Sequence, residues 1–386
     1  MRHPLFGAAT TCYASKWGSG MRAGASLSRP LTVGRKLTNS FVILVLSFLI
    51  AEGLVRAMDL DRRIMGNPYE GNAILAPLQA DPFLQWRGRA GIRLYATDER
   101  FNSRGFRTPE ILPKGRGVQR IAVLGDSCTF GFVRSDKIGL DLPKPYPAQL
   151  QELLDRSEGP GRYEVVNYGT IGYSTFHGLR ILRKEVLHDD PDFVVIRFGF
   201  NDHLASPVHR SYSSTRSPAR EALEDTLSTS RVLSLLFFFR GNPVPDFGKW
   251  RSSAHPIVWV APEDYDWHLS RMIDLSRAHG ARPILLDAPA APLDEVWQGD
   301  LRNLVYMSGY ETIEQYYAAH DRYQSITVSV ARTKGVPFVR TAAPSSETRS
   351  YFSGYDIVHP TAAGHERIAR MLYAEISSMV AREQGH

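Results

Sequence analysis

The stretch Arg120–Gly131, RIAVLGDSCTFG, decides the fold of this 386-residue chain. Its first five residues are almost continuously apolar, which is typical of a strand in a parallel sheet that is covered on both faces. The Gly-Asp-Ser turn then leaves Ser127 at the carboxyl end of that strand, at the start of a helix. Ligands of open α/β sheets bind at this edge, so Ser127 is a candidate site residue. Taken alone, Gly-Asp-Ser is equally well explained as a turn with a helix cap.

The alternation of strand and helix continues along the chain. The predicted strands are Arg120–Leu124, Tyr163–Asn167, Phe193–Phe198, Pro283–Asp287 and Val336–Arg340. The predicted helices are Tyr146–Arg156, Phe176–Leu187, Pro262–His279, Thr312–Lys334 and Ala362–Ala381. This order predicts an α/β domain over 118–384 with a doubly wound sheet of about five parallel strands.

Two segments depart from this alternation. Residues 59–117 are rich in Pro, Gly and Arg, and predict an irregular lead-in to the domain. Residues 205–255 form an insertion between the third and fourth strands, which we expect to cap the carboxyl edge of the sheet. The insertion contains the apolar run Val232–Phe239, VLSLLFFF. We expect this run to pack into the core rather than to face lipid or substrate, because exposed patches this apolar are rare.

The composition, 43% hydrophobic and 22% charged, is that of a globular protein. The net charge of +6 arises in residues 1–36, which contain six basic side chains and no acidic one, and which we expect to be disordered. The remainder is therefore nearly neutral, and no nucleic-acid surface is indicated. The two cysteines, Cys12 and Cys128, form neither a disulfide framework nor a metal cluster, and Cys128 is expected to be a small buried thiol.

Residues 37–56 are the candidate membrane segment. Their centre, Phe41–Ala51 (FVILVLSFLIA), is apolar except for Ser47. We predict a transmembrane signal anchor, with the basic N-terminus in the cytoplasm and the catalytic domain in the periplasm or outside the cell. The alternatives are a cleaved signal peptide, for which Ala51-Glu52-Gly53 is a poor cleavage site, and a buried amphipathic helix or organelle presequence.

Three more polar segments fall at the same predicted edge of the sheet as Ser127. They are Asn167–Ser174 (NYGTIGYS) after the second strand, Gly199–Asp202 (GFND) after the third, and Asp356–Pro360 (DIVHP) before the last helix. An asparagine at a strand end can donate to an oxyanion. An aspartate three residues before a histidine can orient the imidazole as a general base towards a serine. Each segment is weak evidence alone, but their common position is specific.

In this order, the four segments resemble the conserved blocks of the SGNH hydrolases, also called GDSL esterases or lipases, and the match runs from about Phe101 to Ala381. The resemblance implies a flavodoxin-like fold with Ser127 as nucleophile and with Asp356 and His359 completing the triad. It implies an oxyanion hole made by the Ser127 N–H, Gly172 and Asn201, with Gly169 as the alternative glycine. It implies no cofactor and no metal. The absence of a G-x-S-x-G elbow argues against an α/β-hydrolase.

A narrower resemblance concerns the lead-in 101–110, FNSRGFRTPE, and the pair Glu52 and Arg56 at the end of the anchor. Both resemble a membrane-anchored bacterial subgroup. The predicted function is serine-dependent hydrolysis of carboxylic esters, with an acylated envelope or extracellular glycan as substrate. The alternatives are an O-acetyltransferase acting on a polysaccharide and a non-catalytic glycan-binding module. Asp202 is expected to be structural, and His203 to lie either at the site or in a surface loop.

Overall fold

The computed structural model describes residues 32–66, 75–95, 97–134, 140–206, 211–212, 217–241, 256–292, 308–342, 348–353 and 355–384. The chain divides into two units, 1–51 and 52–386. Helix α1 (Val33–Met58) is 26 residues long and, among the described residues, the one helix that is long and apolar enough to cross a membrane. A signal sequence has the same properties. Residues 1–31 of the segment 1–36, which we expect to be disordered, lie outside the described ranges. Residues 33–36 belong to α1, so the expectation is wrong for them.

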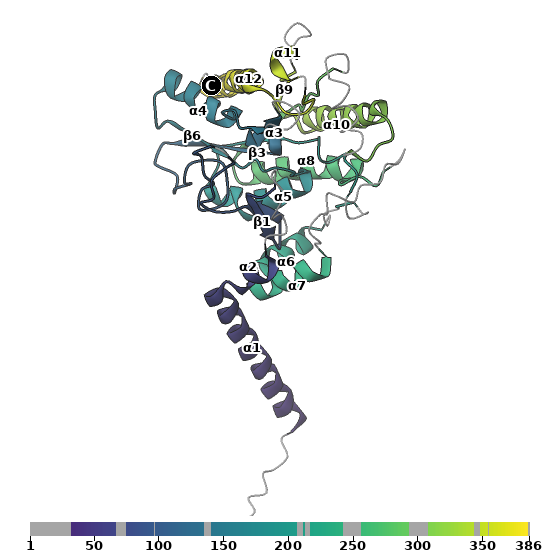
Figure 1. Cartoon of the computed structure of the whole chain (residues 1–386). Coiled ribbons are helices and arrows are strands. Elements are labelled where there is room, and N and C mark those ends of the chain that lie inside the picture. Colours follow the sequence, from purple (N-terminus) through teal and green to yellow (C-terminus); the bar gives the residue numbers. More distant parts are fainter. Residues whose placement is uncertain are drawn as a thin grey trace, which may run out of the picture. The chain divides into compact units, whose positions relative to one another are not determined.

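The second unit is built on a five-stranded parallel sheet (Figure 1). Its strands are β3 (Gln119–Gly125), β6 (Tyr163–Asn167), β7 (Phe193–Arg197), β8 (Arg282–Leu286) and β9 (Phe338–Val339). Their spatial order is β6-β3-β7-β8-β9, which is 2-1-3-4-5 in chain order. This is the flavodoxin-like doubly wound order, so the predicted fold class is confirmed.

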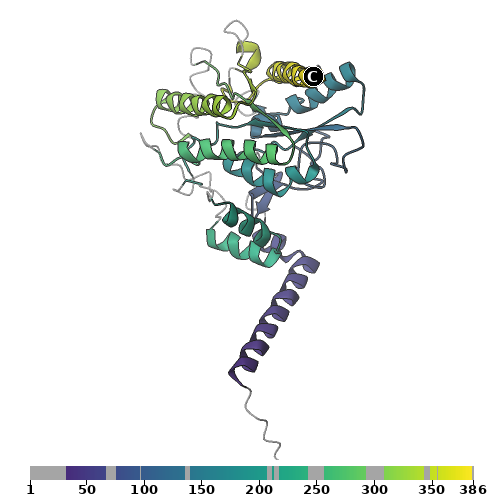
Figure 2. The same cartoon turned by 180° about the vertical axis from the view of Figure 1, so that it is seen from behind.

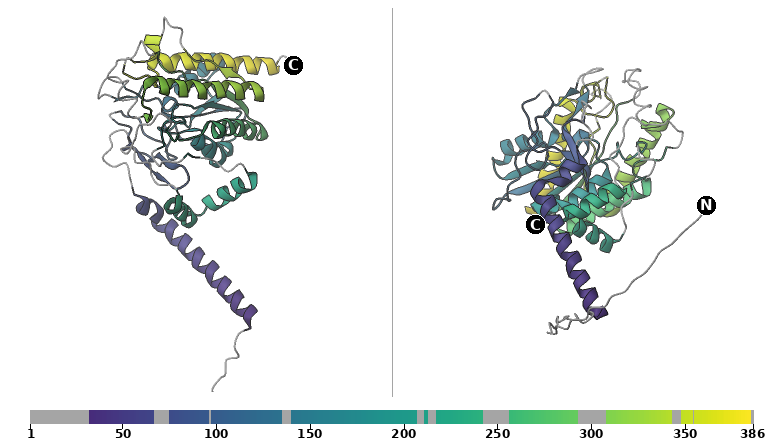
Figure 3. Two further views of the ribbon diagram at one scale, coloured as in Figure 1. Left: turned by 90° about the vertical axis from the view of Figure 1, so that its right-hand side faces the viewer. Right: turned by 60° about the horizontal axis from the view of Figure 1, so that its bottom comes forward.

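Alternate residues of strand β3, which lies between β6 and β7, face two different cores. Ala122 and Leu124 belong to the core that helices α5 (Thr175–Lys184) and α8 (Pro262–Ala278) cover. Ile121 and Val123 belong to the core that α4 (Tyr146–Glu158) and α12 (Ala362–Gln384) cover. Helix α10 (Ile313–Lys334) contributes to both cores. Figures 2 and 3 show the helical layers on the two sides of the sheet. The continuous apolar character of β3 follows from burial on both faces.

The lead-in differs from the irregular segment that was expected. It contains the short helix α2 (Leu60–Met65) and an antiparallel hairpin of β1 (Leu78–Asp81) and β2 (Gln85–Gly88). Trp86 in β2 is 1% exposed and belongs to the core beneath α5 and α8. The hairpin is therefore part of the hydrophobic core and not a linker.

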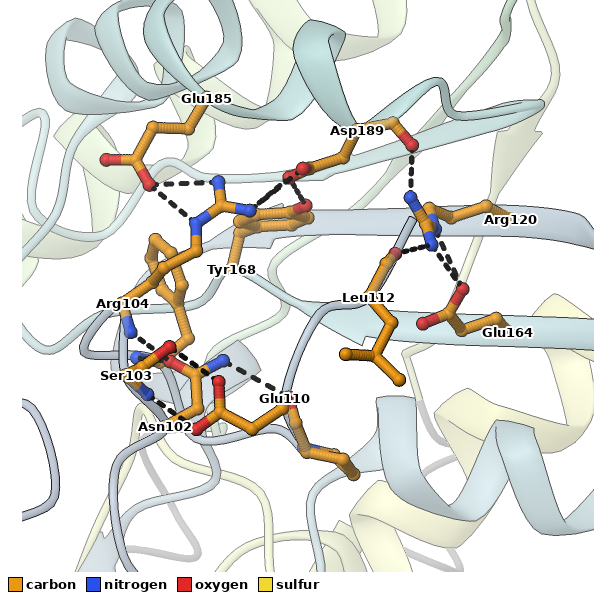
Figure 4. Close-up of polar contacts among 12 residues, drawn as sticks. Asn102, Ser103, Arg104, Glu110, Leu112, Arg120, Glu164, Tyr168, Glu185 and Asp189 are labelled. Carbon is orange, nitrogen blue, oxygen red and sulfur yellow. Dashed lines mark hydrogen bonds and ion pairs between the residues drawn. The ribbon is translucent and has the colours of Figure 1, made fainter. Parts of the chain in front are cut away.

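The partly buried Arg104 and the buried Arg120 fix the rest of the lead-in (Figure 4). Arg104 forms ion pairs with Glu185 at 3.0 Å and with Asp189 at 2.8 Å. Arg120, at the start of β3, donates to the carbonyl oxygen of Leu112 at 2.6 Å. Because the carboxylates compensate for the desolvation of the guanidinium groups, these contacts hold the lead-in against the amino end of the sheet.

The described part of the insertion forms two helices, α6 (Pro218–Ser228) and α7 (Arg231–Gly241). Glu221 of α6 pairs with Arg271 of α8 at 2.6 Å, and Asp225 pairs with Arg183 of α5 at 2.7 Å. Helix α6 therefore adjoins α5 and α8, and α7 contacts α6, so these two helices do not cap the carboxyl edge as expected (Figure 1). Residues 207–210, 213–216 and 242–255 of the insertion lie outside the described ranges.

The apolar run of α7 packs only in part. Leu235 is 9% exposed, whereas Leu236 and Phe239 are 61% and 67% exposed. The expectation that this run lies in the core is therefore wrong for Leu236 and Phe239.

Candidate active site

Ser127 begins a one-turn helix at the end of strand β3. Helix α3 (Ser127–Phe130) follows β3 directly, and the Asp126 carboxylate accepts the Cys128 N–H at 2.9 Å as its N-cap. Gly131 ends the helix at φ 89°, a conformation that favours glycine. A strand and a helix that meet in so short a turn hold the serine at the carboxyl edge of the sheet, where it is 8% exposed.

The structure brings Ser127, His359 and Asp356 together, although more than two hundred residues separate the serine from the other two. Ser127 Oγ lies 2.7 Å from His359 Nε2. His359 Nδ1 lies 2.8 Å from Asp356 Oδ2 and 3.0 Å from Oδ1. These distances form an unbroken hydrogen-bonded chain from hydroxyl to imidazole to carboxylate.

Backbone N–H groups hold the Asp356 carboxylate in place. Oδ1 accepts from the N–H groups of Val358 and His359, each at 3.0 Å, and Oδ2 accepts from the N–H of Arg134 at 3.0 Å. Burial alone would raise the pKa of Asp356, but the neighbouring His359 and the donated N–H groups lower it below its ordinary value. The group therefore remains a charged carboxylate beside the imidazole.

Two further residues, Phe132 and Arg134, contact His359 and Asp356, and the sequence does not single them out. Arg134 contributes through its backbone, from the two-residue strand β4 (Val133–Arg134). The ring of Phe132 meets His359 edge-on, with centroids 5.0 Å apart and planes at 74°. Both residues follow Ser127 closely in the chain, but nothing in their side-chain chemistry distinguishes them from ordinary loop residues.

Gly172 lies in the turn after β6 at φ 79°. A Cβ there would lie 3.1 Å from Cζ2 of Trp86, whose indole N–H donates to the carbonyl of Ile171 at 2.9 Å. Within the described ranges, the N–H groups of Gly172 and Ser127 donate no hydrogen bond to other residues. Both the backbone conformation and the nearby Trp86 ring therefore require glycine at position 172. The N–H of Gly172 is available to donate to a ligand.

Asn201, after β7, contacts the same turn. Its Nδ2 donates to the carbonyl of Tyr173 at 2.8 Å. An asparagine amide carries two N–H donors. This bond uses one of them and fixes the amide, and the second N–H remains available. Tyr173 directly follows Gly172, so the segments after β6 and β7 are joined at the candidate site.

Asn167 and Gly169 join the turn after β6 to the serine helix. The Asn167 side chain accepts the Gly169 N–H at 2.8 Å and donates to the Thr129 carbonyl at 3.0 Å. A Cβ on Gly169 would lie 2.6 Å from the backbone nitrogen of Phe130. The two backbones meet so closely here that Gly169 has a packing reason to be glycine.

The model of the GDSL-like Lipase/Acylhydrolase family matches residues 123–367, which include Ser127, Gly172, Asn201, Asp356 and His359. The chain belongs to this family. It is therefore an ester-hydrolysing enzyme, and the predicted relationship is confirmed at the level of the family. A comparison with curated protein sequences gives no match.

Solved structures of esterases resemble this GDSL-like hydrolase distantly. An acetylxylan esterase from Geobacillus stearothermophilus is 19% identical over 68% of this chain and 96% of its own, with a TM-score of 0.41. A lipase/acylhydrolase from Enterococcus faecalis is 17% identical over 68% of this chain and 97% of its own, with a TM-score of 0.41. A GDSL-like lipase from Bacteroides thetaiotaomicron is 13% identical over 68% and 89%, with a TM-score of 0.39.

Asp202 of this GDSL-like hydrolase is fully buried next to the candidate site. Its Oδ1 accepts from the N–H of Thr175 at 2.8 Å and from the Thr175 hydroxyl at 2.5 Å. Burial raises the pKa of Asp202 to about 7, against the lowering effect of the Thr175 bonds. Because Thr175 begins α5, Asp202 fixes that helix to the end of β7, a structural position as expected.

His203 is not in a surface loop. It is fully buried, and its Nε2 lies 3.2 Å from Nδ1 of His320, whose own Nε2 donates to the Ala288 carbonyl at 2.7 Å. Burial, followed by the neighbouring histidine, lowers the pKa of His203 well below its ordinary value. Both imidazoles are therefore neutral core groups of the hydrolase.

Cys128 and Arg197 lie beneath the serine turn. Cys128 is fully buried, as predicted, and its thiol donates to the Val358 carbonyl at 3.4 Å. Burial, and then the Asp126 charge, raises the pKa of the thiol well above its ordinary value, so it stays protonated. Arg197, the last residue of β7, is also fully buried, with Nη1 3.7 Å from Asp126 Oδ1. Within the described ranges, no group of three or more His, Cys, Asp and Glu side chains is arranged to hold a metal ion.

Proposed function

We propose that this hydrolase cleaves carboxylic esters through an acyl-enzyme on Ser127, with His359 as general base and Asp356 as the group that orients it. The observation that carries the proposal is the hydrogen-bonded chain of 2.7 Å and 2.8 Å from hydroxyl to imidazole to carboxylate. A serine hydroxyl is a weak nucleophile at its free pKa and needs an adjacent base. The Asp356 carboxylate accepts the Nδ1–H, which leaves Nε2 free to take the serine proton.

In the first half-reaction, Ser127 Oγ attacks the ester carbonyl as its proton passes to His359 Nε2. The tetrahedral intermediate collapses, and the departing alkoxide takes that proton from Nε2 and leaves as the alcohol. In the second half-reaction, water loses a proton to Nε2, attacks the acyl-serine and releases the carboxylic acid. The proton on Nε2 then returns to Ser127 Oγ. Asp356 stabilises the imidazolium in both halves without taking its proton.

We assign the oxyanion donors to the N–H groups of Ser127 and Gly172 and to the second amide N–H of Asn201. The two backbone groups donate to no described residue, and the Asn201 amide is held by Tyr173 at 2.8 Å. Preorganised donors of this kind lower the barrier because they need no reorganisation as charge develops. The packing role of Gly169 against Phe130 favours Gly172 over Gly169 for this function.

The proposed substrate is an acylated glycan of the envelope or exterior, with an acetyl group as the acyl chain. The support is the resemblance of the lead-in 101–110 and of Glu52 and Arg56 to a membrane-anchored subgroup. We propose that α1 remains as a signal anchor, with the basic N-terminus in the cytoplasm and the catalytic domain on the other side of the membrane. Resistance of the chain to alkaline carbonate extraction, and protease access from outside intact spheroplasts, test this topology.

The catalytic assignment is tested by hydrolysis of p-nitrophenyl acetate, butyrate and octanoate by the full chain in detergent. Ser127→Ala and His359→Ala are expected to lower kcat by about 10⁴-fold or more, because each removes the acyl-enzyme route. Ser157→Ala, which changes an exposed serine of α4, serves as the matched control and should retain wild-type kcat. Undiminished turnover by a folded Ser127→Ala variant would refute the assignment.

The acyl preference and the acceptor are read from the same preparation. A rate that falls from acetate to octanoate supports a deacetylase, and acetate release from an acetylated polysaccharide supports the glycan. Transfer of the acetyl group to a polysaccharide hydroxyl in place of water would instead establish the O-acetyltransferase.

A further inference from the structure

Exposed apolar side chains concentrate where the folded unit begins. Five large hydrophobic residues at the end of α1, in α2 and in α7 are between 49% and 67% exposed. They are Leu54, Met58, Ile64, Leu236 and Phe239. Helices α2 and α7 contact each other, and Figure 1 shows them side by side. We call these five residues the α7 patch. Elsewhere in this unit, only Leu112, Leu223 and Ile257 of the described residues are large, apolar and exposed.

The last turns of α1 cap both helices of the insertion. The Glu52 carboxylate accepts the N–H groups of Arg231 and Val232, the first residues of α7, each at 3.0 Å. Arg56, one turn later, pairs with Glu52 at 2.7 Å and donates to the carbonyl of Thr229 at 2.7 Å, at the end of α6. An anion at a helix N-terminus and a cation at a C-terminus each satisfy backbone groups that the helices leave unpaired.

The protonation of Glu52 is consistent with this capping. Burial raises its pKa, but the N–H groups of Val232 and Arg231 and its side-chain partners act more strongly, and lower the pKa to about 2. The carboxylate is therefore charged at every physiological pH. Within residues 52–386, Glu52 is thus a charged N-cap of α7, and this contact is called the joint below.

This joint lies directly after the apolar run in the chain. The apolar run Phe41–Ala51 ends directly before Glu52, and α1 continues unbroken to Met58. The first turn of α7 therefore begins one hydrogen bond away from the residue that follows the apolar run. Arg56 and Arg63, both exposed, follow the apolar run closely in the chain, as is typical of basic side chains at the headgroup region.

We propose that the α7 patch docks onto the surface of the same bilayer that α1 crosses, with Leu236 and Phe239 at the boundary between headgroups and acyl chains. The proposal rests on the signal anchor proposed above. It accounts for the exposure of these apolar side chains, and for their concentration in and near the helices that follow the anchor in the chain. Docking at two points, the span and the patch, fixes the orientation of the hydrolase above the membrane.

Spin labels on the full chain, reconstituted into vesicles of palmitoyl-oleoyl phosphatidylcholine and phosphatidylglycerol, test the docking. In a Cys12→Ser background, which leaves the buried Cys128 unlabelled, the label is introduced by Leu236→Cys or Phe239→Cys. Ile43→Cys in α1 is the control for the anchor, and Leu112→Cys is an equally exposed control away from the patch. The readout is the ratio of collisions with oxygen, which partitions into lipid, to collisions with a water-soluble nickel chelate.

The expected result is a ratio at residues 236 and 239 that exceeds the ratio at 112 and approaches the ratio at 43. A high ratio at 43 with water-like ratios at 236 and 239 would overturn the docking and leave the anchor intact. Labels at 236 and 239 that collide with neither oxygen nor the nickel chelate would indicate a protein partner, such as a second copy. This result would also overturn the docking. A water-like ratio at 43 would refute the anchor and the docking together. Ester hydrolysis by Ser127 is measured separately, so this result would not bear on it.

A second variant tests the joint itself. Glu52→Gln removes the charge that caps α7 but keeps an acceptor oxygen in place. The expected result is a lower ratio and higher label mobility at 239 with no change at 43. An unchanged ratio at 239 in this variant would show that the joint does not hold α7 at the bilayer.

Discussion

Two buried aspartates near the serine have pKa values shifted in opposite directions, and the difference lies in their partners. Asp356 accepts three backbone N–H groups and faces an imidazole, so its pKa falls. Asp202 has the two donors of Thr175 and little compensating charge, so burial raises its pKa to about 7. The first is suited to stabilise an imidazolium, and the second to hold a helix in place.

Asp356→Asn is expected to lower kcat by about 10⁴-fold. The NH2 group of the asparagine would face either the Nδ1–H of His359 or the N–H of Arg134, and each of these donors needs an acceptor. The folded pKa is below the unfolded value of about 3.9, so the ionised group stabilises the wild type above that pH. This stabilisation is lost as the pH falls through the folded pKa. Urea unfolding between pH 7 and 3 should therefore show a shallower acid loss in the variant, and parallel curves would contradict this.

For Asp202 we predict the opposite dependence of stability on pH. Its folded pKa of about 7 lies above its unfolded pKa, so its contribution to stability is full below about pH 4 and is lost as the pH rises through 7. Relative to Asp202→Asn, the wild type should lose about 1.4 kcal/mol of unfolding free energy per pH unit across that window. Chemical unfolding of both proteins at pH 5, 6, 7 and 8 measures the slope. A difference that does not change with pH would show that Asp202 is ionised throughout.

At the scale of elements, the hairpin of β1 and β2 supports the turn that carries Gly172. Trp86→Phe keeps an aromatic ring but removes the N–H that the Ile171 carbonyl accepts at 2.9 Å. We expect a loss of about 1–2 kcal/mol in unfolding free energy, because a buried carbonyl loses its donor. We also expect kcat to fall more than KM rises, because the N–H of Gly172, the proposed oxyanion donor, moves. Trp267→Phe in α8 is the matched control, and an equal effect of both changes on kcat would contradict a specific role for Trp86.

The elements that the sequence predicts well are the long or strongly apolar ones. The ranges predicted for β3, β6, β7 and the helices α4, α8, α10 and α12 agree with the structure to within a few residues. Each contains its own signal, because burial on both faces of the sheet or one apolar helical face appears directly in the residue pattern. The convergence of Ser127, Asp356 and His359 was also predictable, because each lies at an end of a regular element on one edge of the sheet.

The hairpin of β1 and β2 and the pair of β4 and β5 (Leu140–Asp141) were not predictable. Their strands have two to four residues, too few for a period of two to stand out. His203 was misplaced because burial of a loop histidine depends on a distant partner, here His320. The position of α6 depends in the same way on ion pairs with Arg183 and Arg271, which pattern alone cannot assign.

At the scale of the whole molecule, the folded unit begins at Glu52, inside α1, and not after it. A fragment that starts at Glu52 retains the caps of α6 and α7, whereas one that starts at Asp59 loses them. Lost caps cost about 1 kcal/mol each. The Arg231 and Val232 amides should therefore exchange hydrogen about fivefold or more faster in the shorter fragment, as measured by mass spectrometry in detergent. The amides of β3 serve as the internal control, and equal exchange at α7 in both fragments would contradict the joint.

The burial of Cys128 makes the enzyme its own conformational reporter. The thiol lies directly after Ser127, is fully shielded, and is the one cysteine within residues 52–386. An alkylating reagent can reach it only when the turn that contains Ser127 opens, so the labelling rate of the native protein measures how often that turn opens. Ligands that close around Ser127 should slow that rate in proportion to their occupancy. Even an ester that is never hydrolysed could then be recognised as a ligand of the enzyme.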